Sequence, residues 1–221
     1  LKGANLHFNA FDLGGEGGTA LIQAARNGYN DVLQKLLNDG AEINTTELMF
    51  HHSALMAAAL NGHLKSVILL LSAGADPILK DTSQRTALLL AATNNHLTVI
   101  KHLLEKNQNG MQTDSNGNGI WHLLAISDGQ KNTSEDSTEI VKKGKDNFSI
   151  MKELISKGIP LDSKNNDGET ALMLAVKKEN LQLVKMLLKL GASADIFSPN
   201  GENALSLAET TGNIEVLNLL R

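Results

Sequence analysis

A short phrase that recurs at a near-constant interval is the feature that most constrains the fold of this chain. It begins with Thr19-Ala20-Leu21 and returns with the same character at Ser53, Thr86, Thr170 and Asn203. The steps are 34 residues (19 to 53), 33 (53 to 86) and 33 (170 to 203). A fixed period of this length is typical of stacked supersecondary units that bury a continuous core between neighbours. The chain is therefore predicted to be a solenoid, which offers a long surface in place of a single pocket.

Each period reads as two short helices followed by a turn and an extended finger. In the most regular copy, Thr86 stands at a helix start, where its hydroxyl is expected to cap a free backbone N–H. Small and aliphatic residues follow, and Asn94-Asn95 separates them from a second helix with an apolar face over 97–104. Helices this short need stacking for stability. We expect left-handed glycines to end the second helices, at Gly40, Gly74, Gly158 and Gly191.

The recurring phrase resembles the first helix of ankyrin repeats, a 33-residue unit with the pattern Thr-Pro-Leu-His-x-Ala. Here Thr-Ala-Leu replaces Thr-Pro-Leu, only His122 fills the histidine place, and Gly62-His63 matches the family's Gly-His turn. The resemblance covers essentially the whole chain. It implies an all-α repeat solenoid of stacked helix-turn-helix units with projecting β-hairpin or finger loops. It also implies that the rings of His63 and His96 bond backbone between repeats.

The period and the resemblance together predict six units, preceded by the close of an earlier one. Neither end of the chain has the polar outer face of a capping repeat, so we expect a fragment of a longer protein. The expected bounds are 1–13 for the end of a preceding repeat, 14–47, 48–80, 81–113, 114–164 with an insertion at 128–145, 165–197, and 198–221 for an incomplete last repeat.

The register breaks in the fourth unit, where Gly119 loses the cap and Trp121 replaces leucine. We expect Trp121 to serve packing. The insertion 128–145 has almost no apolar residues, and its four acids and four lysines cancel. This composition favours a solvated loop between the two helices of one repeat. The alternative is a partner contact, or phosphorylation around Thr133, Ser134, Ser137 and Thr138.

Composition and charge exclude several classes of function. The chain has no cysteine, which rules out disulfides, cysteine nucleophiles and thiolate zinc sites. Its net charge of −4 lacks the basic footprint of nucleic-acid binding, and no apolar run reaches the ~20 residues of a membrane span. We expect no nucleic acid, no membrane insertion and a monomeric array. The expected location is the cytoplasm, or the host cytosol for a bacterial effector, with the nucleus also open.

No catalytic arrangement stands out among the residues that usually carry chemistry. Seven histidines are present, and none forms a metalloprotease pair with a nearby glutamate. The glycine-rich stretch 14–18 and Lys143-Gly144-Lys145 lack the spacing of nucleotide-binding loops. We therefore predict no enzyme activity, no cofactor and no metal.

Finger tips and the ends of first helices are where the resemblance implies partner contacts. One tip departs from the polar norm, because 48–52 reads Leu-Met-Phe-His-His and Leu60 belongs to the same repeat. Exposed aromatic and methionine side chains resemble interface anchors, and packing between fingers accounts for them equally well. The predicted contact residues are Met49, Phe50, His52, Leu60, Asn61, Arg85, Asn94 and Arg26.

These observations favour a non-catalytic scaffold that binds another protein across its fingers and first helices, on the concave face of the array. The alternative is a targeting or regulatory arm of a larger enzyme or of a host-directed bacterial effector. A third class, binding of a small molecule or lipid headgroup, lacks a convergent basic cluster. A smaller hypothesis concerns Asn44, whose surroundings resemble the pattern modified by an asparaginyl hydroxylase of animal cells. A plain hydrogen bond within the turn is the alternative interpretation of Asn44.

Overall fold

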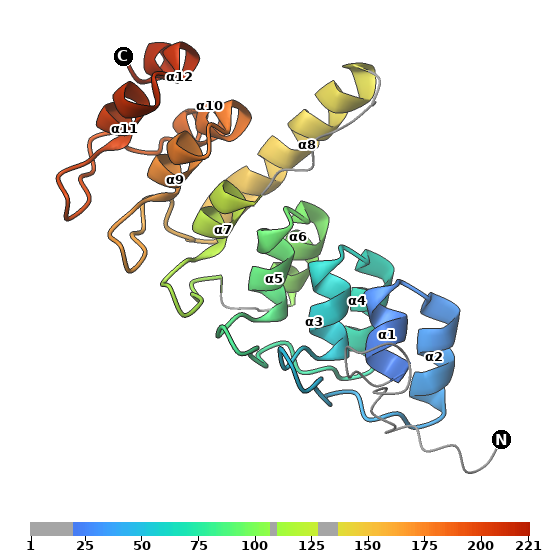
Figure 1. The fold of residues 1–221 in the computed structure, drawn as a ribbon. Coiled ribbons are helices and arrows are strands. Elements are labelled where there is room, and N and C mark those ends of the chain that lie inside the picture. Colours follow the sequence, from blue (N-terminus) through green and yellow to red (C-terminus); the bar gives the residue numbers. More distant parts are fainter. Residues whose placement is uncertain (1–19, 107–109, 128–136) are drawn as a thin grey trace. The chain divides into compact units, whose positions relative to one another are not determined.

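The described part of the chain consists of helices joined by loops and turns. The structure, a computed structural model, describes residues 20–106, 110–127 and 137–221. These residues form twelve α-helices and one isolated β-bridge (Figure 1). The chain divides into two compact units, Leu1–Gln108 (unit 1) and Asn109–Arg221 (unit 2), and each is described by itself. Among the helices in the described ranges, none combines the length and the apolar character needed to span a membrane.

Unit 1 contains three helix pairs, each with a first helix of seven residues and a second helix of nine. The first helices pack on one another in sequence, and so do the second helices. The central first helices consist mainly of buried alanine and leucine, because small side chains let helices approach closely on both sides. The first helices are α1 (Ala20–Arg26), α3 (Ala54–Leu60) and α5 (Ala87–Thr93), and the second helices are α2 (Asn30–Asn38), α4 (Leu64–Ser72) and α6 (Leu97–Glu105).

Unit 2 repeats this arrangement with three further pairs. First helix α7 packs on α9, α9 on α11, and second helix α10 packs on α12. Trp121 in α7 is 1% exposed, and its indole N–H donates to the carbonyl oxygen of Ile159 at 3.4 Å, so its predicted packing role is confirmed. The first helices are α7 (Ile120–Ile126), α9 (Ala171–Lys177) and α11 (Ala204–Thr211), and the second helices are α8 (Ser137–Ser156), α10 (Leu181–Lys189) and α12 (Ile214–Leu220).

The expected loop at 128–145 is corrected by helix α8. Residues 137–145 form its N-terminal part, and the whole helix has 20 residues, so a loop over 137–145 is wrong. The segment runs directly into the predicted second helix, and extending a helix costs far less than starting one. Ser137 and Thr138 open α8, whereas residues 128–136, including Thr133 and Ser134, lie outside the described residues.

Three of the first helices, α3, α9 and α11, begin with a reciprocal pair of hydrogen bonds. Ser53 Oγ accepts from the backbone N–H of Met56 at 3.3 Å, and Met56 Sδ accepts from the backbone N–H of Ser53 at 3.4 Å. Such a pair satisfies two backbone donors that a helix start leaves free. The same exchange recurs between Thr170 and Met173 and between Asn203 and Ser206.

The predicted cap by Thr86 is wrong. Its buried hydroxyl has no hydrogen-bond partner among the described residues, and it does not cap α5. Leu89 occupies the position of Met56 in this repeat, and its side chain has no acceptor for the Thr86 N–H. The second hydrogen bond of the pair, from the backbone N–H of Thr86 to a side chain, is therefore also missing. This is the repeat whose sequence is the most regular.

Histidines fasten the turns of unit 1 to the preceding helix pair, as the resemblance implied. His63 Nε2 lies 3.0 Å from the carbonyl oxygen of Arg26, and His96 Nε2 lies 3.1 Å from that of Leu60. Each ring packs against a left-handed glycine of the preceding turn, and a Cβ added to Gly62 would lie 2.5 Å from His96 Nδ1. These contacts tie one helix pair to the next.

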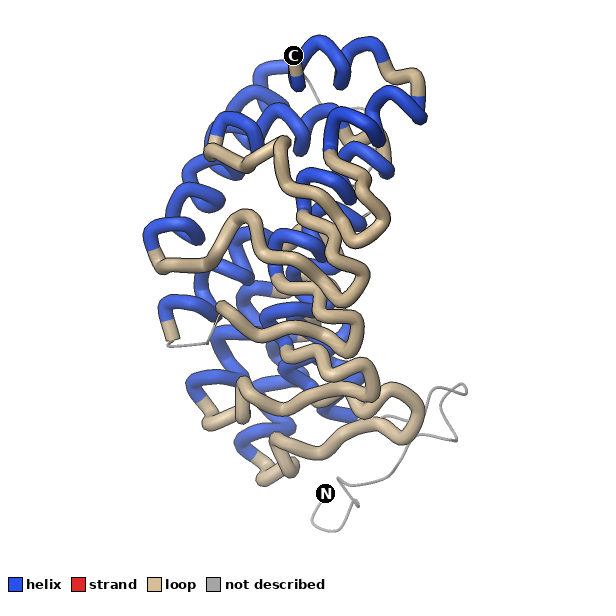
Figure 2. The backbone as a smooth tube through the Cα atoms, turned by 90° about the vertical axis from the view of Figure 1, so that its left-hand side faces the viewer, coloured by secondary structure: helices blue, strands red, loops and turns tan. Residues whose placement is uncertain are grey.

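Fingers three to six share one tip geometry. In each, the backbone N–H of the first tip residue donates to the carbonyl oxygen four residues later, for example from Asp81 to Arg85 at 2.9 Å. The fourth tip residue has a positive φ, as at Gln84 and Gly117. Figure 2 shows these loops side by side within each unit. The tips are 81–85 (finger three), 114–118 (four), 165–169 (five) and 198–202 (six).

The tip of finger two, 47–52, is one residue longer than the tips of fingers three to six. Its closing hydrogen bond runs from the N–H of Glu47 to the carbonyl oxygen of His52 at 3.0 Å. The isolated bridge between Thr46 and Ser53 lies just outside this tip. The extra residue accounts for the first step of the period, which is 34 where the others are 33.

Candidate functional site

The tip of finger two exposes three large apolar side chains. Leu48 is 61% exposed, Met49 59% and Phe50 50%. The other four tips, all within the described ranges, expose no leucine, methionine, isoleucine, valine or aromatic side chain. The structure therefore brings Met49 and Phe50 together at an accessible tip. Packing between fingers leaves at least half of each of these side chains in contact with solvent.

Five charged or titratable side chains join this tip to its neighbours, and we call them the charged row. Arg26 Nη2 donates to Glu47 Oε2 at 2.5 Å, and Glu47 Oε1 lies 3.2 Å from His52 Nδ1. His52 Nε2 lies 3.5 Å from Asp81 Oδ2, which accepts from Arg85 Nε at 2.8 Å. The row therefore links the end of α1 to fingers two and three.

The two acids of the charged row are buried, at 1% exposure for Glu47 and 3% for Asp81. Asp81 Oδ1 also accepts from the backbone N–H groups of Ser83 and Arg85, both at 2.8 Å. Buried carboxylates need such partners, because an unpaired charge away from water is costly. The row thus ties the base of the apolar tip to Arg26 and Arg85 through buried, paired carboxylates.

His52 does not line the accessible surface, which corrects its place among the predicted contact residues. Its side chain is buried, and the Phe50 ring stacks on it with centroids 5.7 Å apart. Burial lowers the pKa of His52, while the carboxylates of Glu47 and Asp81 act in the opposite direction. Its Nε2 has no hydrogen-bond partner among the described residues. His52 therefore supports Phe50 from within.

The predicted residues at the ends of the first helices lie on the surface of unit 1. Asn61 and Asn94 are exposed, and Leu60 is half-buried. The amide group of Asn61 donates to the carbonyl oxygen of Ala57 at 2.9 Å, and that of Asn94 donates to that of Leu60 at 2.8 Å. The side chains of Arg26 and Arg85 are 22% and 24% exposed. All of these residues belong to unit 1.

Asn44 lies apart from the tip, in the loop between α2 and finger two. Its side chain is exposed, and its Oδ1 accepts from the backbone N–H of Asp76, in the loop that follows α4, at 2.8 Å. Asp162 makes the corresponding bond to the N–H of Ser193 in unit 2, at 3.1 Å. Asn44 is therefore a link between successive turns, and its proposed modification stays a prediction.

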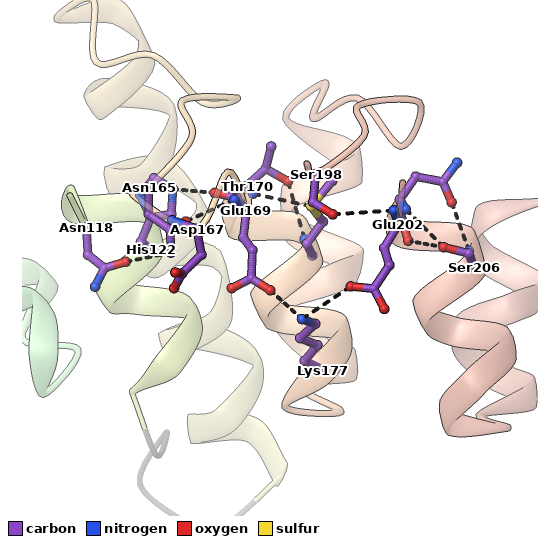
Figure 3. Close-up of polar contacts among 12 residues, drawn as sticks. Asn118, His122, Asn165, Asp167, Glu169, Thr170, Lys177, Ser198, Glu202 and Ser206 are labelled. Carbon is purple, nitrogen blue, oxygen red and sulfur yellow. Dashed lines mark hydrogen bonds and ion pairs between the residues drawn. The ribbon is translucent and has the colours of Figure 1, made fainter. Parts of the chain in front are cut away.

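The fingers of unit 2 carry a polar surface, shown in Figure 3. Lys177 forms ion pairs with Glu169 and, at 3.7 Å, with Glu202. Its hydrogen bond to Glu169 raises the pKa of Lys177. The amide of Asn165 donates to Asn118 Oδ1 at 3.1 Å across neighbouring fingers. This surface pairs several of its polar groups internally. Its tips 114–118, 165–169 and 198–202 expose no large apolar side chain, although Phe197, which is 54% exposed, lies immediately before the last of them.

Among the described residues, no group of three or more histidine, aspartate or glutamate side chains is arranged to hold a metal ion. The charged row includes three such residues, but each carboxylate is already paired with an arginine. Its geometry suits a structural role.

Reasoning from sequence missed Glu47 and Asp81 as the residues that support the site. Both stand at the first position of a finger tip, as Asp114 does in finger four. One signal in the sequence indicates that finger two differs from the other fingers, namely the 34-residue step of the period. The extra residue of that step lies in the tip that begins at Glu47. Nothing local in the sequence shows that the carboxylates are buried.

A family model described as "Ankyrin repeats (3 copies)" matches residues 21–114, 55–135 and 138–221, which is most of the chain. The chain belongs to the ankyrin-repeat family. Ankyrin repeats are generally protein–protein interaction modules, and their fold is typically non-catalytic. The predicted family and the predicted all-α repeat solenoid are confirmed.

Curated relatives share parts of this ankyrin array. Inversin from Gallus gallus is 34% identical over 119 residues, which is 54% of this chain and 11% of that protein. A Caenorhabditis elegans homolog of transient receptor potential cation channel subfamily A member 1 is 26% identical over 157 residues, or 71% of this chain and 11% of that protein. The chain thus spans about a tenth of the length of these relatives.

Two solved structures share the fold over nearly the whole chain. The ankyrin repeat domain of Bcl-3 aligns with a TM-score of 0.72 at 22% identity, covering 93% of this chain and 86% of that one. A chain from the complex of a predatory endopeptidase from Bdellovibrio bacteriovorus with an immunity protein aligns with a TM-score of 0.70 at 25% identity. That match covers 92% of this chain and 97% of the other.

Proposed function

We propose that this ankyrin array binds a partner protein through unit 1, at the tip of finger two and the adjoining ends of the first helices. The observation that carries the proposal is the exposed apolar tip of Met49 and Phe50 on a base held by buried ion pairs. Rigid, accessible aromatic and methionine side chains supply much of the binding energy at protein interfaces. Ordering such a tip costs little on binding, because its base is already held.

The contact surface extends from the tip toward the helix ends. Leu60, Asn61 and Asn94 lie at the ends of α3 and α5, in the same two repeats as fingers two and three. Arg26 and Arg85 add partly exposed guanidinium groups. An apolar centre with polar groups around it is the usual layout of a protein interface.

The test compares capture of proteins by the full chain and by a variant carrying Met49→Ser, Phe50→Ser and Leu60→Ser. Replacing three anchors is expected to weaken binding roughly a hundredfold or more, at about 1 kcal/mol or more each. Quantitative mass spectrometry should show proteins that the wild type enriches and the variant loses, with circular dichroism confirming that the variant folds.

The matched control changes exposed residues of unit 2, with Asp167→Ser, Lys178→Ser and Asn200→Ser. This control should retain every protein that the wild type captures. Equal capture by the folded triple variant of unit 1 would overturn the proposal.

A second proposed role is that of a targeting or regulatory arm within a larger protein, an enzyme or a host-directed bacterial effector. It is supported by the length of the curated relatives, of which this chain covers about a tenth. A cytoplasmic or host-cytosolic location belongs to the same proposal. Tagged full-length protein, located by microscopy and assayed with and without the array, tests it.

Hydroxylation of Asn44 is a separate and smaller proposal. Its support is the exposed position of the side chain, and its Oδ1 is held by the N–H of Asp76. Mass spectrometry of the protein produced in animal cells should show the added oxygen on the peptide that contains Asn44. An unmodified peptide would remove the proposal.

A further inference from the structure

The accessible surface of unit 1 has an uneven distribution of charge. Its described first helices α1, α3 and α5 contain no acid, and the only acids in the tips of fingers two and three are Glu47 and Asp81. Their side chains are 1% and 0% exposed, whereas those of Arg26 and Arg85 are 22% and 24% exposed. Each ion pair therefore points its positive end toward solvent and its negative end inward.

Arg85 has hydrogen-bonding capacity that the protein does not use. A guanidinium carries five N–H donors in a planar fork, and here Nε donates to Asp81 Oδ2 at 2.8 Å. Within the described ranges, the two terminal amino groups of Arg85 donate to no protein group. Two terminal amino groups on a side chain whose orientation is already fixed match the geometry of a second carboxylate.

Arg85 is joined to the apolar tip through a short series of contacts. The Phe50 ring stacks on His52, His52 Nε2 lies 3.5 Å from Asp81 Oδ2, and that oxygen accepts from Arg85. The backbone N–H of Thr82 also donates to the carbonyl oxygen of Phe50 at 3.1 Å. The apolar anchor and the guanidinium are therefore held in a fixed relation to each other.

We propose that this surface recognises an acidic segment of a partner, in which an aspartate or glutamate lies close to a large apolar side chain. The carboxylate is received by the terminal amino groups of Arg85, and the apolar side chain packs on Met49 and Phe50. This inference rests on the proposed function, and it adds the chemistry of the partner. Charge complementarity indicates that the partner segment is acidic, because the described first helices of unit 1 and the tips of fingers two and three present no exposed acid that would attract a basic segment.

Unit 2 does not offer this combination. Its cation on a first helix, Lys177, is already paired with Glu169 and Glu202. Glu202 and Glu209 keep 43% and 56% of their side chains exposed, so the described fingers and first helices of unit 2 would repel an acidic segment. Lys177 is accordingly the matched control for Arg85.

The experiment selects from a display library of random linear dodecapeptides on the full chain at low ionic strength. We expect the enriched peptides to combine aspartate or glutamate with a nearby aromatic or large aliphatic residue. A selected peptide, measured by fluorescence anisotropy, should bind Arg85→Gln about tenfold or more weakly, because a charged hydrogen-bonded pair is lost. Lys177→Gln should leave the affinity unchanged.

A second variant guards against local unfolding, since Arg85→Gln leaves the buried Asp81 carboxylate without its cation. Arg85→Lys keeps a positive charge beside Asp81 but loses the planar fork, so it should also weaken the selected peptide severalfold. In the Arg85→Lys variant, hydrogen exchange across finger three should match that of the wild type, which shows that the finger is still folded.

The outcomes separate this inference from the proposed function. Enriched peptides without acids, or equal affinity for wild type and both Arg85 variants, would overturn the acidic-segment inference alone. Peptides that bind equally well after Met49→Ser and Phe50→Ser would contradict the proposed surface itself. Absence of enrichment would count against recognition of a short segment, while the capture experiment tests the surface independently.

Discussion

The tips of finger two and finger four are closed by similar backbone hydrogen bonds but present different side chains to solvent. Both tips are closed by a hydrogen bond from their first N–H, at 3.0 Å from Glu47 and 3.1 Å from Asp114. Finger two then exposes Leu-Met-Phe at 48–50, whereas finger four exposes Ser-Asn at 115–116. The closing bond sets the shape of the finger, and the residues between its ends are left to set what the finger can bind.

The bases of the fingers differ in the same way. Unit 1 joins fingers two and three through the buried charged row, and unit 2 joins its fingers through amide hydrogen bonds and the Lys177 pairs. Buried pairs are screened little by solvent and are costly to break, while exposed pairs contribute at most about 1 kcal/mol. We therefore expect unit 1 to be the less tolerant of substitution at its finger bases.

The largest difference should come from the glycines of the helix turns. Gly62 has φ +73°, and a Cβ added to it would lie 2.5 Å from His96 Nδ1, on a ring held by the carbonyl oxygen of Leu60. Gly62→Ala should lower the free energy of unfolding by roughly 3 kcal/mol, from left-handed strain together with the displaced ring. Gly212 in unit 2 has φ +66° and open space around it, so Gly212→Ala should cost only about 1 kcal/mol. Urea unfolding compares the two, and equal costs would contradict the role of His96.

The next largest difference in stability should come from substituting the carboxylates at the finger bases. Glu47→Gln removes the buried partner of Arg26, and because Arg26 is 22% exposed we expect a loss of about 2 kcal/mol, below the usual range for a fully buried pair. Glu202→Gln in unit 2 changes a side chain that is 43% exposed and should cost less than about 0.5 kcal/mol. Thermal unfolding of both variants measures the contrast. A Glu47 variant as stable as the Glu202 variant would mean that the charged row contributes no stability.

A smaller contrast concerns the helix caps. Thr170 accepts from the N–H of Met173 and should lose about 1 kcal/mol when changed to alanine. Thr86 makes no cap, and its buried hydroxyl lacks a partner in the described part of the chain. Thr86→Ala should be neutral or slightly stabilising, because it removes an unsatisfied polar group. Denaturant midpoints of the two alanine variants, measured in parallel, test this prediction. A loss of stability in Thr86→Ala equal to that in Thr170→Ala would mean that Thr86 caps α5 in solution.

The smallest expected effect is the dependence of folding stability on pH. Burial lowers the pKa of His52 and His96 in unit 1 and of His122 in unit 2. A histidine with a lowered folded pKa binds fewer protons folded than unfolded, so its contribution to stability is lost as pH falls through the unfolded value near 6.5. Hydrogen exchange at pH 7.5 and 5.5 should show both units opening more readily at the lower pH. His52→Gln should reduce this pH dependence in unit 1, and an unchanged profile would contradict the assignment.

Much of the fold was predictable, because the phrase at Ser53, Thr86 and Thr170 marks a first helix in every case. The predicted histidine bonds at His63 and His96 followed from the resemblance and are confirmed. The cap at Thr86 was predicted wrongly, because its hydroxyl makes no hydrogen bond to the start of α5 although its phrase resembles that of Thr170, which does cap its helix. The site was harder, since the burial of Glu47, His52 and Asp81 arises when separate fingers stack. The repeat bounds and the contact residues remain predictions.

The most direct test of whether unit 1 carries the binding surface places a photoreactive benzophenone side chain at Phe50 and, in a second protein, at Asn200 of finger six. Both positions are exposed finger-tip residues, and they differ in the surface that surrounds them. After illumination in cells, we expect a covalent adduct with a partner protein from position 50 and none from position 200. An adduct from position 200, or none from position 50 in a correctly folded protein, would contradict the claim that unit 1 carries the binding surface.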